Sequence, residues 1–126
     1  MDKVVIQEKS QNCPGMYFTP AENLLTIEGR SIPENPELVY KPVKDWIVDF
    51  FNDSESLNIK IVLEYINSGS SKHLLDFLKI LRAYHKQGKS LGINWLYEED
   101  DEAILELGEH FRDSSGLPIE IEMLLE

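Results

Sequence analysis

The middle of the chain changes abruptly from a strand pattern to a helix pattern. Residues 58–66 are rich in β-branched and aromatic side chains, which favour extended structure. Apolar residues then recur at the spacing of one helix face, at Leu74, Phe77, Leu78, Leu81 and Tyr84. A strand that passes directly into a helix begins a crossover connection, so the chain is expected to fold as an α/β protein.

The same alternation extends through the rest of the chain, whose 126 residues suit one compact domain. Strands are expected at 16–19, 24–28, 58–66, 91–97 and 117–123, with the first two paired as a hairpin. Helices are expected from Pro36 to about residue 51, from 70 to 87, and around 103–111. The order ββαβαβαβ predicts a mixed four- to five-stranded sheet with about three helices, in a single domain spanning 1–126.

Two segments fit this scheme less well. Residues 1–15 have no clear period and end in the turn signal Asn12-Cys13-Pro14-Gly15, so they are expected to be flexible or irregular. Pro42 lies inside the first expected helix, where a missing backbone N–H breaks a hydrogen bond. We expect that helix to bend there or to start again near Lys41.

Charge and cysteine content narrow the classes of function. The net charge is −11, and residues 98–126 hold eleven acidic residues and one basic residue. Nucleic acids and anionic membranes require clustered Lys and Arg, so neither is an expected partner. The acidic segment is expected to be a solvated surface, and the rival reading is a rim that steers a basic protein. The single Cys13 excludes an internal disulfide, and the short apolar stretch near Met1 does not resemble a signal peptide, so a cytoplasmic location with no membrane insertion is expected.

The sequence does not predict an active site. The histidines His73, His85 and His110 are not spaced as metal ligands, and no nucleophile elbow or glycine-rich phosphate cradle is present. His73 lies near several serines, but it is expected to face away from them. We therefore expect a protein without enzymatic activity, metal or cofactor.

The segment Asn67-Ser68-Gly69-Ser70-Ser71-Lys72 places three hydroxyls where the second helix begins. Free backbone N–H groups and the helix dipole favour negative charge at such a position. The segment can therefore cap the helix, bind an anion or accept a phosphoryl group. Beyond it, Lys72, Lys79 and Lys86 recur every seven residues along one helix face, which is more typical of a solvated surface than of a binding site.

Several blocks of the chain resemble the SiaC family of bacterial regulatory phosphoproteins. They are Leu25–Pro36, which contains Ser31-Ile32-Pro33-Glu34-Asn35-Pro36, then Tyr40-Lys41-Pro42 with Trp46, and Leu63–Asn67 with Ser70-Ser71-Lys72. The resemblance covers about residues 16–126. It implies a STAS-like fold similar to anti-sigma factor antagonists, and control by partner switching.

The resemblance also implies partners and an acceptor residue. A cognate Ser/Thr protein kinase phosphorylates such proteins, a PP2C-type phosphatase reverses this, and the unphosphorylated form activates an effector such as a diguanylate cyclase, which promotes biofilm formation or aggregation. The family's acceptor is typically a threonine directly after the asparagine that corresponds to Asn67, which makes Ser68 the expected acceptor, with Ser70 and Ser71 as alternatives. The next position, usually serine, is Gly69 here.

We therefore expect a non-enzymatic, phosphorylation-controlled partner switch. The residues expected to form or brace its partner surface are Asn67, Gly69, Ser70, Ser71, Lys72, Ser31, Pro33, Glu34 and Asn35. Two other readings remain open at this stage. One is a small anion- or nucleotide-binding domain that uses the helix start as its site. The other is a constitutive adaptor whose serines serve only as helix caps.

Overall fold

The computed structural model describes residues 2–125 and contains a mixed sheet with helices on one face. The elements follow one another as β1 (Val4–Gln7), β2 (Gly15–Thr19), a short 3-10 turn (Pro20–Glu22), β3 (Leu24–Ser31), α1 (Pro36–Phe50), β4 (Ser56–Ile66), α2 (Ser68–Lys86), β5 (Ser90–Tyr97), α3 (Glu102–Ser115) and β6 (Ile119–Met123). The expected α/β class and the alternation of strands and helices are confirmed.

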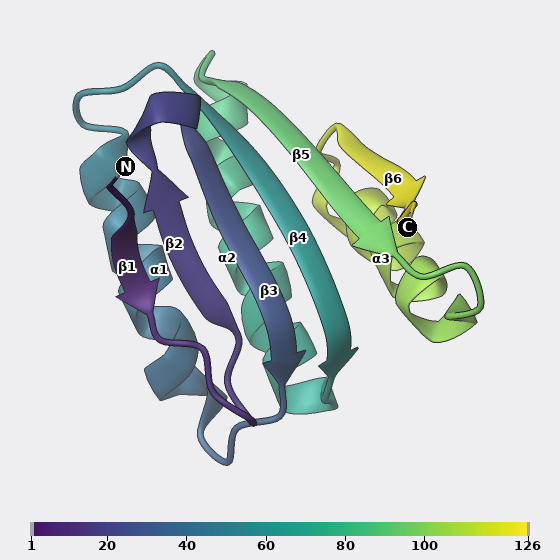
Figure 1. Ribbon diagram of the computed structural model, residues 1–126. Helices are drawn as coiled ribbons and strands as arrows, with labels where there is room; N and C mark the ends of the chain where they lie inside the picture. Colours follow the sequence, from purple (N-terminus) through teal and green to yellow (C-terminus); the bar gives the residue numbers. More distant parts are fainter. Residues whose placement is uncertain (1, 126) are drawn as a thin grey trace.

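Within the described residues, six strands form one sheet in the spatial order β1-β2-β3-β4-β5-β6, so each strand pairs with its neighbours in sequence. The pairs β1–β2 and β2–β3 are antiparallel, and the three pairs from β3 to β6 are parallel. Each parallel pair is joined by a helix, and Figure 1 shows α1, α2 and α3 on the same side of the sheet. Among residues 2–125, this two-layer arrangement leaves the other face of the sheet without helices.

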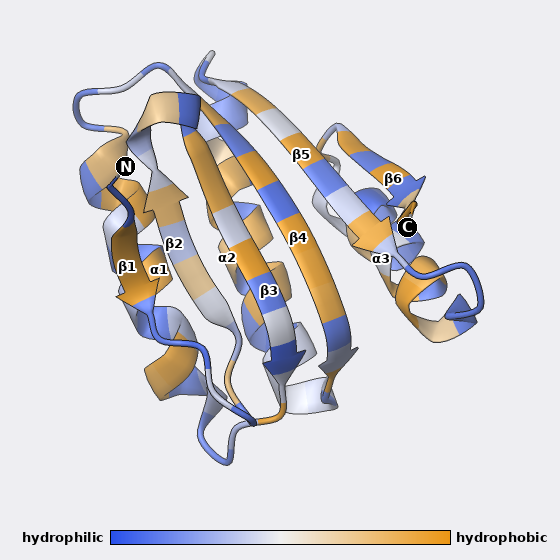
Figure 2. Cartoon of the chain, in the orientation of Figure 1, coloured by the Kyte–Doolittle hydropathy of each residue, from blue (hydrophilic) through white to orange (hydrophobic). Residues whose placement is uncertain are grey.

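The core lies between the helices and the covered face of the sheet. Along β4, Leu57, Ile59, Ile61 and Leu63 are buried while the residues between them are partly or fully exposed. Figure 2 shows this as alternating orange and blue segments along the strand. The period of two gives β4 one apolar face, and α2 meets it with Leu74, Phe77, Leu78 and Leu81.

The N-terminal segment differs from the expectation. Residues 4–7 form β1, which pairs with β2 through Val4–Phe18 and Val5–Tyr17 contacts, with a bulge between Val5 and Gln7. The sheet therefore has six described strands instead of four to five. The strand has only four residues and lies at the edge of the sheet. Its sequence shows no alternation of apolar and polar residues, so no strand was predicted there. Met1 lies outside the described residues.

Two element boundaries also differ. Gly29 was expected to close its strand, but β3 continues through it to Ser31, with a φ of +111° at Gly29 and a register shift against β4. A bulge of this kind uses the conformational freedom of glycine. Pro42 lies inside one continuous helix, α1, so the helix does not start again at Lys41.

Candidate functional site

The junction between β4 and α2 holds the serine cluster, and Asn67 is its first residue. Asn67 is the N-cap of α2, and its side-chain Oδ1 accepts a hydrogen bond of 2.8 Å from the backbone N–H of Ser70. The backbone C=O of Asn67 accepts the first helical bond, from the N–H of Ser71, at 2.9 Å. An asparagine at this position satisfies one of the free donors at a helix start. The expected capping role is therefore filled by Asn67.

The hydroxyls that follow differ in exposure. Ser68, at the first helical position, is exposed, and among residues 2–125 its hydroxyl makes no hydrogen bond. Ser71 is half-buried, and Lys72 is exposed and forms no salt bridge within the described part of the chain. Ser70 is fully buried, at 0% exposure. Of the three candidate acceptors, Ser68 is the most accessible to another protein.

Ser68 and Ser71 line a shallow groove between the start of α2 and α3. The groove has a volume of about 340 Å³. Its apolar side chains include Ile66, Ile104 and Leu107, and the acidic residues Glu64 and Asp101 also line it. Tyr65, which also lines it, is 53% exposed although it is large and aromatic. The sequence did not predict this groove, because its residues come from β4, α2 and α3.

The loop from residue 32 to 35 is flanked by two residues, Ser31 and Pro36, that both contact the start of α2. The backbone C=O of Ser31 accepts a hydrogen bond of 3.0 Å from the N–H of Asn67. Pro36 approaches Gly69 so closely that a Cβ added at Gly69 would lie 3.2 Å from the Pro36 Cγ. In the loop itself Glu34 and Asn35 are exposed, whereas Ser31 and Pro33 are buried.

A buried tyrosine lies behind this junction. The hydroxyls of Tyr40 and Ser31 are 2.9 Å apart, and both side chains are at 0% exposure. Burial raises the pKa of Tyr40 to about 12, while the hydroxyls of Ser31 and Ser70 act in the opposite direction. The Tyr40 ring also stacks on His73 of α2, with ring centroids 6.3 Å apart.

His73 is directed toward α1 rather than toward the serines. Its Nδ1 lies 3.3 Å from Nζ of Lys44, which is itself 4.0 Å from a carboxylate oxygen of Asp76. Since the ammonium can only donate, the His73 Nδ1 is the acceptor in this pair. His85 and His110 are exposed and lie on different helices. The structure therefore does not bring the three histidines together.

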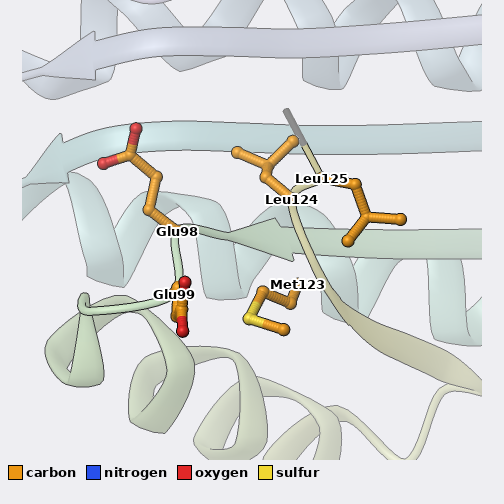
Figure 3. Close-up of a pocket in the computed structure, with 5 residues that line it drawn as sticks. All are labelled: Glu98, Glu99, Met123, Leu124 and Leu125. Carbon is orange, nitrogen blue, oxygen red and sulfur yellow. The ribbon is translucent and has the colours of Figure 1, made fainter.

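Two further recesses lie near the carboxyl ends of the parallel strands, and the sequence did not predict either. The first has a volume of about 340 Å³ and is lined by Glu98, Glu99, Met123, Leu124 and Leu125. Figure 3 shows the two glutamates on one side of it and the apolar residues on the other. The second, of about 350 Å³, shares Glu98 and Leu124 with the first and includes Arg30. Ser68 lines neither recess, but the second shares Glu64 and Asp101 with the groove beside Ser68.

These features define a class of protein: a two-layer α/β domain that presents an exposed serine cluster at a helix start beside an open groove. Comparison with known proteins gives the family. The chain belongs to the SiaC family of regulatory phosphoproteins, whose model matches residues 6–124.

Individual relatives and structures agree with this assignment. An uncharacterised protein of Pseudomonas aeruginosa strain UCBPP-PA14 is 32% identical over 116 residues, which is 86% of this chain and 92% of the relative. SiaC of Pseudomonas aeruginosa matches with a TM-score of 0.86 and 28% identity, covering 98% of this chain and 100% of that chain. A chain of the crystal structure of the diguanylate cyclase SiaD in complex with its activator SiaC, from the same organism, matches with a TM-score of 0.85 and 29% identity, covering 92% of this chain and 96% of that chain.

No helix among residues 2–125 is long and apolar enough to cross a membrane.

Proposed function

We propose that this protein is a phosphorylation-controlled partner switch, and that Ser68 is the residue that carries the phosphoryl group. The observation that supports this most strongly is the position of Ser68, exposed at the first turn of α2 on the edge of the groove. A cognate Ser/Thr protein kinase would add the phosphoryl group, and a PP2C-type phosphatase would remove it. The protein itself would carry out no chemistry.

We further propose that the unphosphorylated form binds and activates an effector such as a diguanylate cyclase. The structural match to a chain from a complex of SiaD with its activator SiaC supports this choice of effector. Such a switch would act in cyclic di-GMP signalling.

The physical properties of the groove explain how phosphorylation would act. A partner that covers Tyr65, Ile66 and Leu107 gains free energy by removing their apolar surface from water. A phosphoryl group on Ser68 brings nearly two negative charges to the edge of that surface. The phosphoryl group would have to lose bound water when the partner docks, which costs free energy. Phosphorylation should therefore block docking.

The two other readings fit the geometry less well. If the serines served only as caps, the Ser68 hydroxyl would be needed at the helix start, but Asn67 already supplies the capping oxygen. A site for a small anion would need donors and cations that converge on a closed pocket. The groove is open, and the charged side chains that line it are acidic.

The effector's affinity for substituted forms of the protein tests the proposal. Ser68→Asp should weaken binding of the diguanylate cyclase by about tenfold or more, which corresponds to about 1.4 kcal/mol of binding free energy. Ser68→Ala adds no charge and should bind like the wild type. Ser114→Asp is the matched control, because Ser114 is exposed near the C-terminal end of α3 and does not line the groove. Equal affinities for the wild type and Ser68→Asp would count against the switch.

A further inference from the structure

A buried pair of hydroxyls joins three elements behind the serine cluster. Ser31 ends β3, Tyr40 lies in α1, and their hydroxyl oxygens are 2.9 Å apart at 0% exposure. The backbone C=O of Ser31 also accepts the N–H of Asn67, the N-cap of α2, at 3.0 Å. Ser31 therefore contacts α1 through its side chain and α2 through its backbone.

Two contacts fix the residues on either side of Ser68. Asn67 is held by Ser31, and its own side chain returns to the N–H of Ser70 at 2.8 Å. Gly69 faces Pro36, where an added Cβ would lie 3.2 Å from Cγ, so the first residue of α1 and the start of α2 are in close contact. Ser68 itself is exposed between these two fixed positions.

The hydroxyl of Tyr40 is one of several buried polar groups in this core. A phenylalanine at this position, which has 0% exposure, would fill almost the same space without a hydroxyl group. The buried hydroxyl of a tyrosine needs a polar partner. Ser70 is also at 0% exposure, and within residues 2–125 its Oγ has no hydrogen-bond partner of ordinary geometry. Buried polar groups of this kind favour one arrangement of the elements over others.

We infer that Tyr40 is a positioning residue: its hydroxyl, bound to Ser31, holds the loop 32–35 and the Ser68 segment together as one composite surface. This inference rests on the proposed function for its biological meaning, because the kinase and the effector would then meet both segments in a fixed arrangement. Fixing a surface before binding reduces the entropy lost when a partner docks.

Hydrogen exchange measured by mass spectrometry tests directly whether the Tyr40 hydroxyl holds the two segments together. Tyr40→Phe removes only the hydroxyl, and amides in residues 31–36 and 66–71 should exchange about tenfold faster, while those in residues 79–86 should not change. Ser31→Ala should have the same effect, and the double variant should add little, because both single changes remove one shared hydrogen bond. Tyr84→Phe is the matched control, since Tyr84 is half-buried at the far end of α2.

A kinetic arm separates positioning from packing. With the cognate kinase and ATP, Tyr40→Phe should raise the KM for the protein substrate about fivefold and leave kcat within about twofold, because a looser surface binds less well but reacts normally once bound. Faster exchange across the whole chain, or no change in exchange, would overturn the inference. An unchanged KM with local loosening would also overturn it. If the wild type took up no phosphate, the proposed function would fail. The exchange result would still decide whether the Tyr40 hydroxyl holds the two segments together.

Discussion

Neighbouring residues at the start of α2 have different tasks. Asn67 supplies the capping oxygen, Ser70 is buried, and Ser68 is left exposed. The sequence places an asparagine and three hydroxyls at this point, but it does not show which of them caps the helix. The assignment depends on backbone angles: Asn67 has an extended ψ of 172°, which orients its side chain toward the N–H of Ser70.

The capping role of Asn67 can be measured. Asn67→Ala should lower the free energy of unfolding by about 1 kcal/mol, because the Ser70 N–H loses its partner. Asn35→Ala is a matched control. Asn35 is the N-cap of α1 but makes no side-chain capping bond. Asn35→Ala should therefore lower the free energy of unfolding by less than about half as much as Asn67→Ala does. Urea denaturation of both variants gives the comparison, and equal losses would show that the Asn67 cap is not used.

The raised pKa of Tyr40 predicts a loss of stability at alkaline pH. The unfolded chain releases this proton near pH 10, whereas the folded protein retains it until about pH 12. Between these values the folded state binds more protons, so the free energy of unfolding should fall by about 2 kcal/mol as the pH rises from 10 to 12.

Tyr40→Phe isolates this contribution. The pKa of Tyr17 is also raised, by its burial and by Glu28, so the wild type alone would report both residues. The variant should lack the Tyr40 part of the alkaline loss when both proteins are denatured with urea across this pH range. Parallel stability curves for the variant and the wild type would contradict the assignment.

Among the helices and strands, those with a strong period were predicted well from the sequence. The alternation in β4 and the apolar stripe of α2 locate both elements within about two residues of their ends. The misses have local causes. β1 is too short and exposed to show a period, β3 passes through Gly29 by means of a bulge, and α1 continues through Pro42 because its buried face, including Tyr40 and Val43, packs on the core.

The packing of α3 on β5 depends on a glycine. A Cβ added at Gly108 would lie 2.4 Å from Cδ1 of Trp95, a buried ring whose Nε1 donates to the C=O of Ile104 at 2.9 Å. Gly108→Ala should therefore lower the free energy of unfolding by about 2–3 kcal/mol through overpacking.

Gly92→Ala is a suitable comparison for Gly108→Ala. Its Cβ would meet Oδ1 of Asn58 at 2.9 Å, but that atom is the end of an exposed side chain that can move away. The change at Gly92 should alter the free energy of unfolding by less than about 1 kcal/mol. Thermal denaturation of both variants would show the difference, and a stable Gly108→Ala protein would mean that α3 packs differently.

Considered together, the elements form a site that no single stretch of sequence describes. The family resemblance named both the loop from Ser31 to Pro36 and the segment from Asn67 to Lys72. It did not show that Ser31 and Asn67 are hydrogen-bonded, or that Ser31 and Ser70 are buried. The groove was not predictable at all, because its lining comes from β4, α2 and α3 and depends on how α3 packs.

The groove can be tested as a docking surface independently of phosphorylation. Ala103→Glu places a carboxylate in the groove at an exposed position in the first turn of α3, where the helix dipole tolerates negative charge. Effector affinity should fall by about tenfold or more, with little change in the free energy of unfolding. Ala83→Glu, at an exposed position on α2 outside the groove, should bind normally. Equal binding by both variants in a calorimetric titration would place the effector elsewhere.

The most direct test of the central claim is to map the phosphoryl group after incubation with the cognate kinase and ATP. Peptide mass spectrometry should find one phosphate on Ser68, and Ser68→Ala should abolish it. Ser70 should remain unmodified in the folded protein, because its side chain is at 0% exposure. Phosphate on any residue other than Ser68, or no phosphate on the wild-type protein, would contradict the account.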